Sequence, residues 1–140
     1  MQATQVESLE RTIQHTNEWL KAIQERMGVE DRRSAYIALR ATLHALRDLL
    51  TPAEAVQLGA QMPTLVRGIY FEGWRLAGRP ARTRARDEFL GAVAVDSGNA
   101  LSDVERSVRA VLGVLRERIS PGEIDDVRGT LPQAVRELWP

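Results

Sequence analysis

Apolar residues recur every three or four positions along most of the chain, which is the spacing of one face of an α-helix. This spacing predicts a first helix over about residues 5–27, closed by Gly28, and a second helix over about 31–50. The expected buried face of the first helix is Val6, Leu9, Ile13, Leu20, Ile23 and Met27. That of the second helix is Tyr36, Leu39, Leu43, Leu46 and Leu50. No stretch alternates apolar and polar residues over five positions, so the sequence predicts no strand.

Helix starts are marked by capping boxes, in which a hydroxyl side chain accepts from the helix and a glutamate three residues later returns to the backbone. The segments with this residue order are Thr51–Glu54, Ser102–Glu105 and Ser120–Glu123. Pro63 and Pro132 predict two further helix starts. A helix near 85–95 is expected before a loop at 96–99, and a long helix is expected to end at Ile119. The sequence therefore predicts an all-α protein of about eight helices.

The second half of the chain repeats the first at an offset of 69 residues. Residues 38–70 and 107–139 share 10 identities over 33 ungapped positions, where chance gives about two. At an offset of 70, residues 17–20 also match 87–90. We therefore expect two pseudo-symmetric four-helix repeats, residues 17–74 and 87–140, joined by a connector at 75–86. The repeats are expected to pack as one bundle-like domain over residues 1–140, because a unit of about 55 residues is near the lower limit for an independent core.

Composition excludes several classes of protein. The 19 basic and 19 acidic residues give a net charge of zero, which argues against a surface dedicated to nucleic acid. The absence of cysteine excludes disulfides, thiolate metal sites and thiol catalysis. The first residues show no signal-peptide pattern, and the longest uncharged run, 55–66, is interrupted by Pro63. We therefore expect a cytoplasmic protein that does not enter a membrane.

Three segments resemble the bacterial family of domain of unknown function 2267: 38–48 (ALRATLHALRD), 54–63 (EAVQLGAQMP) and 65–74 (LVRGIYFEGW). The resemblance implies a small helical protein of this duplicated kind and supplies no activity. The second repeat departs from the motif, since Gly113 replaces His44 and residues 128–130 replace 59–61. Function is therefore expected on the first repeat and the connector.

Few residues in the sequence form a pattern that indicates binding or catalysis. Three arginines occur in both repeats, as the pairs Arg40 and Arg109, Arg47 and Arg116, and Arg67 and Arg136. They are expected to form ion pairs with carboxylates such as Asp48 and Glu117, or to line an anion cleft. His15 with Glu18 and His44 with Asp48 lie one helical turn apart, but the order and number of histidines do not fit a di-iron bundle. No nucleophile motif or phosphate-binding loop accompanies them. We therefore assign no catalytic, cofactor or metal residue.

The connector carries five arginines and no acidic residue, whereas residues 87–140 carry 6 basic and 10 acidic groups. We expect the arginines of the connector to be solvated or paired within the protein. Binding of an acidic protein partner is the second interpretation, and binding of nucleic acid is the least favoured.

Two functional hypotheses remain open. The first is a non-enzymatic protein-interaction or scaffold module, with self-association possible. The alternative is a small-molecule or anion binder, conceivably an enzyme, with its pocket at the join between the repeats. A concave polar pocket favours the binder, and an exposed apolar patch favours the interaction module. The tentative ligand or partner surface is His44, Arg47, Asp48, Gln61, Arg67, Trp74, Arg75 and Arg79.

Overall fold

A computed structural model describes residues 6–140 of the protein. This part of the chain forms eight helices and no strand, as the sequence predicts. The helices are α1 (Glu7–Met27), α2 (Arg32–Leu49), α3 (Pro52–Ala60), α4 (Thr64–Phe71), α5 (Arg86–Asp96), α6 (Val104–Arg118), α7 (Pro121–Thr130) and α8 (Gln133–Arg136). None of the helices in this region combines the length and the apolar character that crossing a membrane requires.

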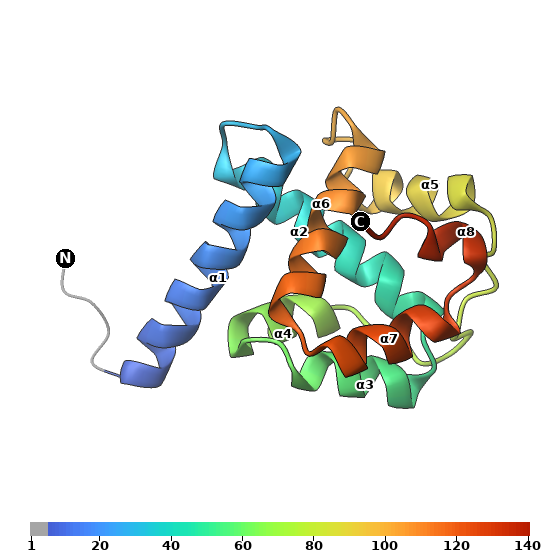
Figure 1. The fold of residues 1–140 in the computed structure, drawn as a ribbon, viewed down its shortest axis with the longest axis horizontal. Helices are drawn as coiled ribbons and strands as arrows, with labels where there is room; N and C mark the ends of the chain where they lie inside the picture. The colour runs from blue at the N-terminus through green and yellow to red at the C-terminus, as the bar shows by residue number, and fades with distance from the viewer. Residues whose placement is uncertain (1–5) are drawn as a thin grey trace.

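The helices α2 and α6 form the centre of the fold (Figure 1). They contact one another, and each also contacts both α1 and α5. The helices α3 and α7 lie side by side along one edge, and α8 contacts α5 (Figure 1). Each central helix contributes a row of fully buried aliphatic side chains, as expected for a helix whose apolar stripe faces a core. These include Leu39, Leu43 and Leu46 of α2 and Val108, Leu112 and Leu115 of α6.

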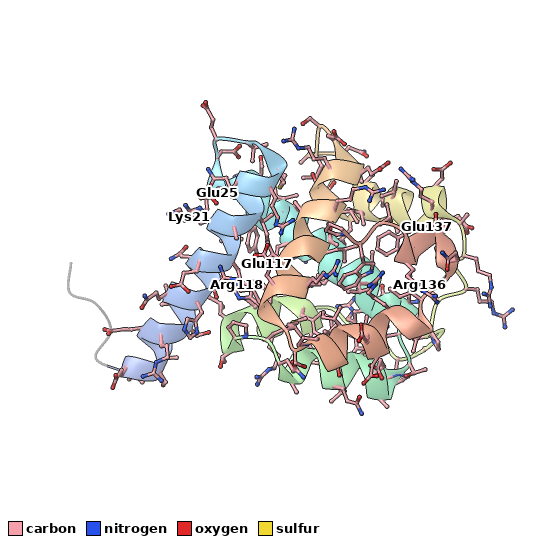
Figure 2. All side chains as sticks on the ribbon, viewed as in Figure 1. Lys21, Glu25, Glu117, Arg118, Arg136 and Glu137 are labelled. Atoms are coloured by element: carbon pink, nitrogen blue, oxygen red, sulfur yellow. The ribbon has the colours of Figure 1, made fainter. Side chains whose placement is uncertain are left out.

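The helix α1 belongs to the core over only part of its length. Leu20, Ile23 and Met27 are buried, whereas Leu9 and Ile13 are 50% and 49% exposed. The prediction that the whole apolar stripe is buried is therefore wrong for the first turns, which project beyond the body of the molecule (Figure 1). Figure 2 shows Lys21 and Glu25 on the side of α1 turned away from the other helices. The predicted start of this helix at residue 5 lies outside the described residues.

Tyr36 is a second departure from the expected core. It is 39% exposed at the start of α2, although Leu39, Leu43, Leu46 and Leu50 on the same predicted face are buried. The phenol ring can remain partly in water because its hydroxyl group is polar.

At the starts of α3 and α7, only one of the two hydrogen bonds of each predicted capping box is present. Thr51 Oγ1 accepts from the backbone N–H of Glu54 at 3.2 Å, and Ser120 Oγ accepts from that of Glu123 at 3.4 Å. The glutamates do not return to the cap: the Ser120 N–H donates instead to Gln61 Oε1 at 3.1 Å. In α6 the cap is Asp103 rather than the predicted Ser102. An ionised carboxylate is the stronger acceptor for the N–H groups of a helix start.

Candidate functional site

A cleft of about 660 Å3 lies between α2, α5 and the first residues of the connector. We call it the join cleft, because its walls come from both halves of the chain. Five of the eight residues predicted from the sequence line it: His44, Arg47, Asp48, Arg75 and Arg79. The cleft also contains carboxylates that sequence reasoning missed: Glu72 at the end of α4, and Glu88 and Asp96 on the opposite wall formed by α5.

His44 connects three helices at the back of the cleft. Its Nε2 lies 2.8 Å from the carbonyl oxygen of Ile69 in α4, and its Nδ1 lies 3.5 Å from Asp96 Oδ2 in α5. Because a carbonyl oxygen only accepts, Nε2 carries the hydrogen of this bond. Both ring nitrogens therefore face protein atoms, and only 8% of the side chain is exposed. This geometry makes His44 a structural link rather than a general base for a bound molecule.

Arg47 is buried and attaches α2 to the end of α4. Its Nε donates to Asp48 Oδ1 at 2.9 Å, and its NH1 donates to the carbonyl oxygens of Tyr70 and Glu72 at 2.8 and 3.0 Å. The expected ion pair with Asp48 is therefore present. Most of the hydrogen-bonding capacity of this guanidinium is used inside the protein, so Arg47 shapes the cleft more than it offers donors to a ligand.

Asp48 fixes the connector through both its side chain and its backbone. Its Oδ2 lies 3.2 Å from Arg79 NH2, and its carbonyl oxygen accepts from the Ala81 N–H at 2.7 Å. The Nε of Arg79 is buried and has no hydrogen-bond partner among the described residues. An unpaired buried donor costs free energy, so this N–H is a local cost of fixing the connector against α2.

Arg40 forms a charged part of the cleft wall together with two carboxylates. Its Nε donates to Glu72 Oε1 at 2.8 Å, and its NH1 lies 3.8 Å from Asp96 Oδ2. The hydrogen bond that Arg40 donates to Glu72 raises the pKa of Arg40, so this group remains a cation.

Two glycines leave space in the cleft. Gly91 is in the interior of α5, and Gly73 has a φ of +71° after α4. A Cβ atom added at either residue would meet no atom within 4 Å. A glycine inside a helix costs roughly 1 kcal/mol relative to alanine, and no packing contact at Gly91 explains that cost. The open space at Gly91 extends the cleft along α5.

Arg75 is exposed at the mouth of the cleft. Its guanidinium makes no hydrogen bond or ion pair with any residue between 6 and 140. It is therefore the cleft cation whose donors are fully free for a ligand.

The other three predicted residues lie elsewhere. Gln61 accepts from the Ser120 N–H, and Arg67 donates to the carbonyl oxygens of Gly59 and Met62 at 2.9 and 3.0 Å. Both residues thus hold helix ends in place. Trp74 is half-buried and packs against Phe71, with ring centroids 5.4 Å apart. None of the three lines the join cleft.

A second cluster of titratable groups lies between α3 and α7. Carboxylate oxygens of Glu54, Glu123 and Asp126 lie within 4.8 Å of one another. Burial, together with the charges of Glu54 and Asp126, raises the pKa of Glu123 to about 7. Burial also raises the pKa of Tyr70, whose hydroxyl donates to the carbonyl oxygen of Ala55 at 2.8 Å. Carboxylates are ligands of hard cations, but the raised pKa shows that a proton also relieves their repulsion.

Comparison with known proteins gives the family of the chain. Residues 16–138 match the profile of the family described as "Uncharacterized conserved protein (DUF2267)". The chain belongs to this family. All the residues of the join cleft fall inside the matched region. No curated protein is significantly similar to the chain.

Membership of the DUF2267 family agrees with the resemblance carried by the three sequence segments, and it brings no activity with it. The function must therefore be argued from the join cleft itself.

Proposed function

We propose that this DUF2267 protein is a non-enzymatic binder of a small polar molecule that carries a carboxylate or phosphate group. The observation that carries the proposal is the join cleft, where the unpaired guanidinium of Arg75 and the side chain of Arg79 line open space. Of the two hypotheses drawn from the sequence, a concave polar cleft favours the binder. Planar guanidinium groups bind carboxylate and phosphate oxygens through paired hydrogen bonds.

The opposite wall limits which anions are suitable. Glu88 and Asp96 would repel a ligand of uniformly negative charge, and they would accept hydrogen bonds from an ammonium or hydroxyl group. The charge pattern therefore favours a molecule with an anionic group at one end and hydrogen-bond donors at the other. A free phosphorylated or unmodified amino acid has this chemistry.

The contacts of His44 support binding without catalysis. Both of its ring nitrogens already face Ile69 and Asp96, so the histidine of this cleft has no nitrogen directed at a bound molecule. General acid–base catalysis needs such a group within hydrogen-bond reach of the reacting atom.

We also propose that the chain consists of two repeated units that share one core. Residues 17–74 and 87–140 are taken as duplicated units of a single domain, and residues 75–86 as their connector. The support is that α1 packs on α6 and α5 packs on α2, so that each half covers the central helix of the other. A cleft walled by α2 and α5 would then require both units. A bacterial origin belongs to the same proposal and rests on the family resemblance, and the cytoplasmic location stays a prediction from the sequence.

Isothermal titration calorimetry with O-phospho-L-serine tests the function. The variant Gly91→Leu would place a side chain in the cleft, and Arg75→Gln would remove its free guanidinium. Gly68→Leu is the matched control, because Gly68 is also an exposed helical glycine whose added Cβ meets no atom within 4 Å, and it does not line the cleft.

We expect saturable binding by the natural protein and by Gly68→Leu, and at least about tenfold weaker binding by the two cleft variants, which corresponds to ~1.4 kcal/mol. No heat of binding at millimolar ligand, or equal binding by all four proteins, would refute the proposed function.

A further inference from the structure

The middle of the connector is fixed at both ends. On one side, the Ala81 N–H donates to the Asp48 carbonyl oxygen at 2.7 Å, and Arg79 pairs with Asp48. On the other side, Arg86 forms an ion pair with Glu105. Residues 80–85, which we call the strap, pass over the edge of the molecule between these attachments. The strap therefore presents a defined surface.

The backbone of the strap has unused hydrogen-bonding groups. Residues 81–84 form no helix, turn or bend. Within the part of the chain that the structure describes, Arg82, Thr83 and Arg84 make no hydrogen bond through backbone or side chain. Their exposure alternates: Arg82 and Arg84 are exposed, and Ala81 and Thr83 are half-buried. This alternation is that of an extended segment, and an extended segment with free N–H and C=O groups is an edge on which another strand can pair.

A groove of about 420 Å3 runs beside the strap. One wall is the strap itself, and the other is formed by Leu49 at the end of α2 and by residues 130–132 after α7. Leu131 is buried, and the half-buried Pro132 supplies apolar surface on which an extended peptide would place its inward side chains.

The exposed charged side chains of the strap are all positive. Arg82 and Arg84 have no ion-pair partner among residues 6–140, and side chains two residues apart in an extended chain are about 7 Å apart. A paired peptide has the same repeat, so acidic side chains at every second position would lie opposite both guanidinium groups.

We propose that the strap is a docking edge for an extended acidic segment of a partner protein. The segment pairs its backbone with residues 82–84, directs apolar side chains into the groove and places carboxylates against Arg82 and Arg84. This surface is separate from the join cleft, so it does not depend on the proposed function.

A protein segment fits the strap better than a nucleic acid. The residues that line the groove include no aromatic ring on which bases would stack.

The test uses the full chain and a fluorescein-labelled, end-blocked octapeptide of alternating glutamate and valine, followed by fluorescence anisotropy. The protein variant is Arg82→Gln with Arg84→Gln, which removes two exposed charges without removing a structural contact. Its matched control is Arg33→Gln with Arg118→Gln, which removes two exposed charges elsewhere. The peptide control carries N-methyl groups at alternate residues, so that its charge is kept and its backbone donors are lost. Single-stranded oligothymidylate is a third probe.

We expect saturable peptide binding that weakens at least tenfold in the Arg82/Arg84 variant and with the N-methylated peptide, and that is unchanged in the Arg33/Arg118 variant. Absence of peptide binding at about 1 mM would overturn the proposal. Equal binding by both variants would do the same. Unchanged binding of the N-methylated peptide would show a charge contact without strand pairing. Binding of oligothymidylate in place of the peptide would assign the strap to nucleic acid.

Discussion

Arg67 and Arg136, 69 residues apart, make the same hydrogen bonds in the two halves of the molecule. Arg67 donates from Nε to the Gly59 carbonyl oxygen at 2.9 Å and from NH2 to that of Met62 at 3.0 Å. Arg136 donates from Nε to the Arg128 carbonyl oxygen at 2.9 Å and from NH2 to that of Leu131 at 3.0 Å. Figure 2 shows Arg136 close to the end of α7. Each guanidinium thus adds charged donors to the carbonyl groups at the end of a short helix.

The first prediction follows from these bonds. Arg67→Ala and Arg136→Ala should each lower the free energy of unfolding by ~1–3 kcal/mol, because carbonyl oxygens lose a charged donor. Arg33→Ala, at an exposed position, should change it by less than ~0.5 kcal/mol. Urea denaturation measures all three. Equal stability of the three variants would show that these arginines do not hold the helix ends.

The caps of α3 and α7 give the second prediction. Thr51→Ala and Ser120→Ala should each lower stability by ~1 kcal/mol, because each hydroxyl accepts from a backbone N–H at its helix start. Thermal and chemical denaturation report the loss. Unchanged midpoints for both variants would contradict the helix boundaries.

The third prediction concerns pH. The folded pKa of Glu123, about 7, lies above its ordinary value of 4.5, so the folded protein holds this proton more tightly than the unfolded chain. Stability should therefore fall as the pH rises from about 4.5 through 7, and the full cost, on the order of 2 kcal/mol, should be present above that range.

Glu123→Gln should remove this decline, since an amide stays neutral and can still donate to Glu54. Asp125→Asn, at an exposed position of the same helix, is the control and should keep it. Urea midpoints measured between pH 5 and 8 distinguish them. Parallel pH profiles for the natural protein and Glu123→Gln would show that Glu123 titrates normally.

The fourth prediction concerns two helical glycines, at which substitution by alanine should change stability in opposite directions. Gly91→Ala should stabilise the protein by ~0.5–1 kcal/mol, because its Cβ meets no atom within 4 Å. Gly59→Ala should destabilise it, because a Cβ there would lie 2.7 Å from the Phe71 ring. Thermal unfolding checks both, and a gain in stability at Gly59 would contradict the packing of α3 against α4.

The fifth prediction tests whether the halves depend on each other. A fragment of residues 1–77 lacks α5 and α6, which pack on α2 and α1. It should therefore melt early, aggregate or self-associate. A monomeric fragment with a sharp transition near that of the full protein would show two independent domains.

The sequence predicted the helices because their signals are local. Periodic leucines, proline at the first helical position and hydroxyl caps specify α2, α3 and α7 without reference to the rest of the chain. The apolar stripe of α1 also predicted the correct face, but a stripe does not show how far neighbouring helices extend. Leu9 and Ile13 are exposed for that reason.

The sequence predicted the residues that α2 and the connector contribute to the cleft, but not those on the α5 wall. His44, Arg47 and Asp48 are close in sequence and share α2, so spacing alone brought them together. Glu88 and Asp96 reach the cleft on α5, and no local pattern marks them as partners of α2. Arg67 and Gln61 were assigned to the same surface, but their side chains are used at helix ends instead.

The most direct test of the central claim is an amide NMR titration of the full chain with O-phospho-L-serine. The account predicts saturable shifts concentrated at Gly73, Arg75 and Gly91, with the projecting turns of α1 unaffected. Absence of shifts, or largest shifts away from the join cleft, would contradict it.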